Sequence, residues 1–234
     1  VERLHIEEPE PPAPVTEPEK TFEEVLDEHP VSIQVNGQWQ TFPNAKAAEE
    51  ASYEEYKANL RRNAKNFRIT DEHLGEGGPK AKFQANVNAI RLLKELESAG
   101  QQASPEQQEI LSRYVGWGGI PDAFDPEKLA WASEYTQLKE LLTPEEYAAA
   151  RSSTLNAHYT SPTVIQAIYE AVGRMGFETG NILEPSMGVG NFFGMLPEEM
   201  RNSRLYGVEL DPVSGRIAKQ LYPKADITVG GFET

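Results

Sequence analysis

Helix-like and strand-like segments alternate over the last third of the chain, and this alternation constrains the fold more strongly than any other feature. The predicted order is a helix (162–175), a strand (180–183), a glycine-rich turn with a short helix, a second strand (204–210), another helix (211–222) and a third strand (225–232). Consecutive strands joined by helices form right-handed crossovers, which place the strands parallel in one sheet. The sequence therefore predicts an α/β fold for this part of the chain.

The turn after the first predicted strand carries the segment "EPSMGVGNF", with Gly188 and Gly190 one residue apart. Glu184 closes the first strand, and Glu209 closes the second, about twenty residues after the turn. Ligands of such sheets bind beyond the carboxyl ends of the strands, where glycines let the backbone approach them. A carboxylate at the second position can accept hydrogen bonds from both ribose hydroxyls of a nucleoside. The pattern thus predicts a nucleoside ligand, and the missing third glycine argues against a dinucleotide-dependent oxidoreductase.

A small hairpin unit is predicted near the N-terminus. Residues 31–42, "VSIQVNGQWQTF", alternate apolar and polar side chains around Asn36-Gly37, a dipeptide typical of two-residue hairpin turns. Asn44 is placed to cap the helix that follows. The hairpin and its helix form a small unit, so we expect this unit to pack against another structure.

The middle of the chain is predicted to be mainly helical. Helices are expected at 80–99, at 105–115 and from Thr143 onward, the last two beginning with capping boxes that carry proline at the first helical position. Between them, "GWGGIPDAF" predicts a rigid loop. Its Trp117 is expected to be a buried anchor of the helical region, with stacking on a nucleic-acid base as the alternative.

Composition excludes several classes of function. The chain has no cysteine, so disulfides, thiolate metal sites and cysteine nucleophiles are excluded, and isolated histidines give no reason to expect a metal. The formal net charge is −15, which argues against tight non-specific nucleic-acid binding but leaves room for a local basic groove. No apolar run suggests a membrane span or signal segment, so we expect no membrane partner and a cytoplasmic location. The chain begins with Val1 rather than Met, and we expect it to be a piece of a longer protein.

Three segments resemble a known family. "ILEPSMGVGNFF" is similar to the first cofactor motif of class I S-adenosylmethionine (SAM) methyltransferases, in the form used by N6-adenine DNA methyltransferases. "YGVELDP" resembles their second motif, and "AHYTSPTVIQAIYEAV" resembles the motif that contacts the methionine end of the cofactor. Because this last motif precedes the glycine turn, the order is that of the γ-type. The resemblance implies a Rossmann-like class I sheet, present here only in part, and SAM as the cofactor.

The resemblance also implies a set of cofactor-binding residues. Glu209 would bind the ribose, and Glu184 would bind the methionine amine or else cap the local backbone. Gly231 stands where the family carries an acid beside the adenine, which puts that contact in question. The expected cofactor-binding residues are Thr160, Pro162, Glu184, Pro185, Gly188, Gly190, Phe192, Glu209, Leu210 and Phe232. Ser161-Pro162 is equally an ordinary helix start.

A longer stretch, residues 66–234, resembles the N-terminal methylase part of the large helicase–methylase proteins of conjugative elements and phages. "NFRITDEHLGEGGPKAKFQANVNAIRLL", "LSRYVGWGGIPDAF" and "STLNAHYTSPT" carry this likeness. It implies DNA as a partner of the full-length protein and a helicase region in the same parent chain. The segments then expected are an acidic, Pro/Glu-rich disordered linker (1–30), a β-hairpin plus helix (31–65), a helical region (66–154) and the SAM-binding half of a methyltransferase domain (155–234).

One part of the expected machinery is not in the sequence. Adenine-N6 methylation needs an Asn/Asp-Pro-Pro-aromatic segment to hold the target base. The Pro11-Pro12 pair has no aromatic after it and is interpreted as linker. We therefore expect no catalytic residues here: the chain would be the cofactor-binding portion of a DNA adenine methyltransferase, inactive alone. The alternative is a non-catalytic docking or DNA-binding module of a mobile-element helicase protein, which Gly231 favours slightly.

Overall fold

The computed structural model describes residues 29–155 and 159–233, without the side chains of residues 56–63. Most of the predicted linker therefore lies outside the described residues. So do residues 156–158 of the segment "STLNAHYTSPT". The chain divides into two compact units at about residue 60. The segment boundaries expected from the sequence stay predictions.

The first unit is the predicted hairpin with its helix. Strands β1 (Val31–Val35) and β2 (Gln38–Phe42) pair antiparallel, and α2 (Ala45–Asn63) follows. Asn36 and Gly37 both have positive φ, as a tight hairpin turn requires. The Asn44 side chain accepts a hydrogen bond from the backbone N–H of Ala47 at 2.9 Å, so the predicted cap is confirmed.

The second unit contains a parallel sheet. Its strands β3 (Asn181–Glu184), β4 (Arg204–Glu209) and β5 (Asp226–Val229) lie in the order β3-β4-β5. The connecting elements are the single-turn α8 (Asn191–Gly194), η3 (Glu198–Met200) and α9 (Pro212–Leu221), and α7 (Pro162–Arg174) precedes the sheet. The prediction of an α/β fold with a parallel sheet is confirmed. The third strand is shorter than predicted and ends before Gly230.

The helical region has more elements than the sequence suggested. It contains α3 (Pro79–Ser98), α4 (Pro105–Ser112), η1 (Pro121–Phe124), η2 (Leu129–Trp131), α5 (Ala132–Leu141) and α6 (Pro144–Ser153). Both predicted capping boxes are present, at Ser104 and Thr143. Helix α4 ends before the predicted residue 115 because the buried side chain of Asn86 binds the backbone there: it accepts from the N–H of Val115 at 2.8 Å and donates to the carbonyl of Gly116 at 2.6 Å.

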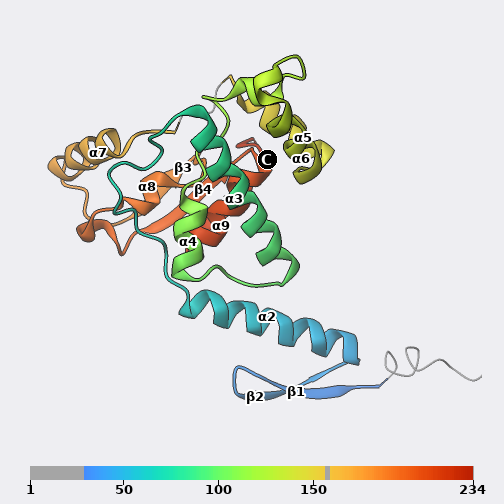
Figure 1. The fold of residues 1–234 in the computed structure, drawn as a ribbon. Helices are drawn as coiled ribbons and strands as arrows, with labels where there is room; N and C mark the ends of the chain where they lie inside the picture. Colours follow the sequence, from blue (N-terminus) through green and yellow to red (C-terminus); the bar gives the residue numbers. More distant parts are fainter. Residues whose placement is uncertain (1–28, 156–158, 234) are drawn as a thin grey trace, which may run out of the picture. The chain divides into compact units, whose positions relative to one another are not determined.

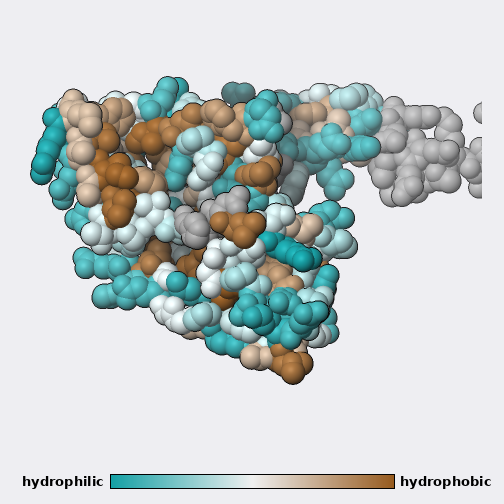
Figure 2. All heavy atoms as spheres, turned by 90° about the horizontal axis from the view of Figure 1, so that it is seen from above, coloured by the Kyte–Doolittle hydropathy of each residue, from teal (hydrophilic) through white to brown (hydrophobic). Residues whose placement is uncertain are grey.

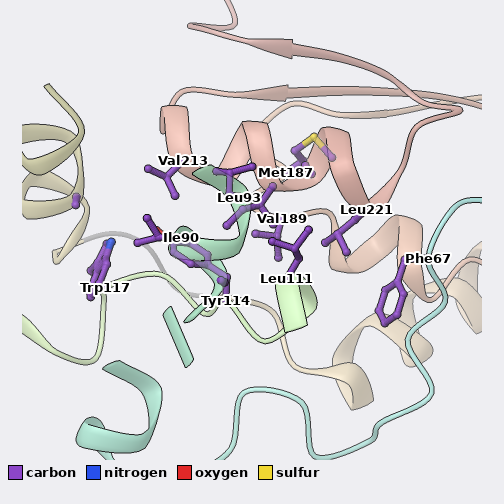
Figure 3. Packing of buried hydrophobic residues seen from close by; sticks show 14 of the residues in the cluster. Phe67, Ile90, Leu93, Leu111, Tyr114, Trp117, Met187, Val189, Val213 and Leu221 are labelled. Carbon is purple, nitrogen blue, oxygen red and sulfur yellow. The ribbon is translucent and has the colours of Figure 1, made fainter. Parts of the chain in front are cut away.

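One hydrophobic core joins the helical region to the sheet. Helices α3 and α4 both contact α9, and the three lie side by side (Figure 1). Ile90 and Leu93 of α3 are fully buried among residues of α9 and of the glycine turn, including Val213 and Val189 (Figure 3). Burying a side chain of this size stabilises a fold by about 1.5–3 kcal/mol. The helical region is therefore part of the same folded body as the sheet.

Helix α7 is covered on one face only. Ile165 and Tyr169 are buried, but Val164 is 49% exposed, Ile168 42% and Met175 80%. Figure 2 shows apolar surface on the side of the second unit where α7 lies in Figure 1. Within the described residues, nothing covers this face. No helix in the described part of the chain is long and apolar enough to cross a membrane.

Candidate functional site

A cavity of about 580 Å³ opens at the carboxyl ends of β3 and β4, a volume within the usual range for small-molecule sites. Its walls come from the glycine turn, the start of α9, the segment after α4 and helix α6. Six of the ten predicted cofactor-binding residues line it: Thr160, Glu184, Gly188, Phe192, Glu209 and Leu210. The parallel strands bring Glu184 and Glu209, with the residues that directly follow them, together because the carboxyl ends of β3 and β4 meet at one edge of the sheet.

Four predicted residues do not line this cavity. Pro162 lines a neighbouring cavity of about 880 Å³ beside α7. Gly190 is buried under the turn, where an added Cβ would lie 2.6 Å from the ring of Tyr222. Pro185 is exposed after β3, and Phe232, beyond β5, is 62% exposed. Direct contact with a ligand stays a prediction for all ten residues.

The carboxylate of Glu209 holds the glycine turn. Its Oε2 accepts a hydrogen bond from the N–H of Gly188 at 2.7 Å, and its Oε1 accepts one from the N–H of Asp211 at 2.7 Å. Burial raises the pKa of Glu209, although these backbone hydrogen bonds oppose the shift. A carboxylate has about four acceptor positions. Gly188 and Asp211 each use one of them and Leu210 adds a further backbone interaction, so only part of the acceptor capacity remains for a ligand in the cavity.

Glu184 is the more strongly perturbed acid. Burial, followed by the nearby charge of Glu209, raises its pKa to about 8. Its Oε2 is buried and has no hydrogen-bond partner among the described residues. Asp211 adds a third carboxyl group, and the described residues that line the cavity include no Lys, Arg or His. The cavity thus favours a ligand that carries positive charge.

We expect the free energy of unfolding to show the cost of ionising Glu184. Between its ordinary pKa of 4.5 and its folded value of about 8, the folded state keeps the proton and the unfolded state loses it, so stability falls as pH rises. From pH 6.5 to 8, wild type should lose about 2 kcal/mol more than Glu184→Gln, which stays neutral. Urea unfolding at both pH values measures this, with the exposed carboxylate of Glu178 changed to Gln as control. Equal pH slopes for wild type and Glu184→Gln would contradict the assignment.

The helical region and the segment just before α7 supply a wall that the sequence motifs did not indicate. Tyr114, Gly116 and Tyr159 line the cavity, and so do Ser152 and Ser153 of α6. The neighbouring Trp117 is fully buried and packs edge-on against Phe83, Tyr114 and Phe124, so its prediction as a buried anchor is confirmed. Two features of the sequence could have indicated this wall. Tyr159 stands directly before Thr160, and glycines surround Trp117 in its loop. In the described part of the chain, no group of three or more acidic or histidine side chains could hold a metal ion.

Known proteins resemble parts of this chain. It is 26% identical over 159 residues to "Defense against restriction protein B" of Escherichia phage P1, a match that covers 68% of this chain and 6% of that protein. It is 37% identical over 76 residues to "Type II methyltransferase M.CvrRI" of Paramecium bursaria Chlorella virus XZ-6E, covering 32% of this chain and 19% of that enzyme. No family model and no solved structure matches. The matched segments are thus small parts of both relatives, and the similarities support a relationship to methyltransferases.

Proposed function

We propose that this chain is the cofactor-binding part of a SAM-dependent DNA adenine-N6 methyltransferase, and that SAM binds in the 580 Å³ cavity. The observation that carries the proposal is the Glu209 carboxylate, which fastens the Gly188 turn at the cavity wall and keeps free acceptor positions. The similarity to a type II methyltransferase supports it.

The acidic character of the cavity suits this ligand. SAM carries a positive sulfonium and a positive ammonium group against one carboxylate, so its net charge is positive. Glu209 would take the ribose hydroxyls, Leu210 would pack beside the nucleoside, and Glu184 would take the methionine ammonium group. The sheet β3-β4-β5 would then be the first part of the sheet of a Rossmann-like class I domain of the γ-type.

The catalytic step belongs to the full-length protein. SAM supplies the methyl group, and adenine N6 is a neutral amine, so the protein's task is to position and hydrogen-bond the two reactants. An Asn/Asp-Pro-Pro-aromatic segment, DNA contacts and a helicase region are expected elsewhere in that protein. The present chain should bind the cofactor without methylating DNA.

Calorimetric titration with SAM tests the proposal. We expect saturable binding with one site per chain, and no competition from NAD at the same concentration. Binding of NAD instead of SAM would replace the proposal by an oxidoreductase function. Binding of neither ligand, by this chain and by the full-length protein alike, would overturn it and leave a docking or DNA-binding module.

A further inference from the structure

The ring of Tyr159 lies between two glycine turns that are far apart in the sequence. One is Gly116, after α4, and the other is Gly188, after β3. A Cβ added at Gly116 would lie 2.6 Å from Cε2 of the ring, and one added at Gly188 would lie 2.9 Å from Cε1. Both glycines have positive φ, +66° and +56°. The ring thus fills the space between the turns so closely that each backbone can present only a hydrogen atom to it.

Further contacts fix the orientation of this ring. The Tyr159 hydroxyl lies 3.1 Å from the hydroxyl of Ser214 in the first turn of α9. The ring of Tyr114 packs against it edge-on, with the centroids 6.5 Å apart. Burial raises the pKa of Tyr159, so its hydroxyl stays protonated at neutral pH. Tyr159 is therefore held by the helical region and by α9 at the same time.

Both glycine turns are themselves held by buried or part-buried polar groups. The carbonyl of Gly116 accepts from Asn86, a fully buried residue of α3. The N–H of Gly188 donates to Glu209. An unbroken series of contacts thus runs from α3 through Gly116 and Tyr159 to the turn that carries Gly188 and Glu209.

We propose that Tyr159 is a positioning residue of the cavity: its ring sets the conformation of the Gly188 turn, and through it the helical region determines the affinity for SAM. The inference rests on the proposed function for its ligand. The contacts of Tyr159 that carry the inference involve only residues of this chain, so part of the test needs no ligand.

The first experiment compares two alanine substitutions in one loop. Gly116→Ala pushes a methyl group into the Tyr159 ring, whereas a methyl group at Gly119 meets no atom within 4 Å and needs no unusual φ. Because the added methyl group must displace the ring or the turn that the ring contacts, we expect Gly116→Ala to weaken SAM binding by roughly ten-fold or more, and Gly119→Ala by less than about two-fold. Thermal unfolding verifies that both variants are folded at the titration temperature. Equal affinities for the two variants would overturn the inference.

A double-mutant cycle separates positioning from general damage. Tyr159→Leu removes the ring atoms that the Gly116→Ala methyl group would strike. If the glycine acts through the ring, Gly116→Ala should lower the affinity by a smaller factor in the Tyr159→Leu background than in wild type, because only the strain of alanine at φ +66° remains, while independent effects would multiply. Tyr159→Phe keeps the ring and should bind within about three-fold of wild type. Multiplying effects, or a Phe variant as weak as the Leu variant, would contradict the role of the ring.

Amide hydrogen exchange at Gly188 tests the same inference without SAM. Its N–H is bonded to Glu209, so protection reports the conformation of the turn. Protection should fall in Gly116→Ala and Tyr159→Leu and stay unchanged in Gly119→Ala. Unchanged protection in all three would sink the inference even where wild type binds SAM. Failure of both this chain and the full-length protein to bind SAM, with the exchange pattern as expected, would refute the proposed function alone.

Discussion

Replacing Glu209 by alanine is expected to weaken SAM binding by roughly a hundred-fold or more. Two losses combine in this variant. The ribose hydroxyls lose a charged acceptor, and hydrogen bonds to a charged group contribute about 1.5–3 kcal/mol each. The N–H groups of Gly188 and Asp211 also lose their partner, which frees the turn that shapes the cavity. Calorimetric titration with SAM measures the affinity.

Two further variants make the Glu209 result specific. Glu209→Gln keeps the size of the side chain and one acceptor oxygen, so it should fall between wild type and Glu209→Ala. Glu178→Ala removes an exposed carboxylate outside the 580 Å³ cavity and should bind like wild type. Should Glu209→Ala bind SAM within three-fold of wild type, the cofactor does not lie in this cavity.

Local sequence patterns were sufficient to predict that three acidic and glycine positions lie together at one edge of the sheet. Glu184, Gly188 and Glu209 sit at strand ends and in the turn between them, and parallel pairing then brings them to one edge. Capping residues such as Ser104 and Thr143 likewise act on backbone groups within three residues, which a sequence shows directly.

The wall from the helical region could not be predicted in this way. Tyr159 meets Gly116 across more than forty residues of chain, and only packing of the whole core decides that contact. The same applies to Asn86, whose side chain ends α4 early by binding the backbone of a different segment. Pro162 belongs to a motif near the cavity, yet it lines the separate cavity of about 880 Å³ beside α7. The motifs predict the neighbourhood of these residues, and tertiary packing decides which of them line the 580 Å³ cavity.

Helical region and sheet are also joined by a charged cluster around Glu146. This α6 side chain is only 6% exposed. Its oxygens accept from Lys94 of α3 at 2.8 Å, from Arg216 of α9 at 2.8 Å and from the N–H of Thr143 at 2.9 Å. Burial alone would raise the pKa of Glu146, but these hydrogen bonds hold it below its ordinary value, so the group is ionised at neutral pH. One carboxylate therefore links three helices.

Glu146→Ala should lower the free energy of unfolding by about 3 kcal/mol, because it leaves two cations without their shared partner. Lys94 and Arg216 remain about a third exposed, which keeps the loss near the lower end for a broken buried pair. Urea unfolding at pH 7 measures it, with Glu145→Ala, an exposed neighbour in the same helical turn, expected to change stability by less than about 0.5 kcal/mol. The side chain of Glu146→Gln can still accept a hydrogen bond from the N–H of Thr143. This variant should therefore lose less stability than the alanine variant.

The pH dependence of Glu146→Ala gives an independent check of the charge. A carboxyl group whose folded pKa is depressed stabilises the fold above its ordinary pKa, and this contribution disappears as pH falls through the folded value. The difference in stability between wild type and Glu146→Ala should therefore shrink on acidification below about pH 4.5. A difference that stays constant down to pH 3 would mean that packing of the side chain, and not its charge, holds α6 to α3 and α9.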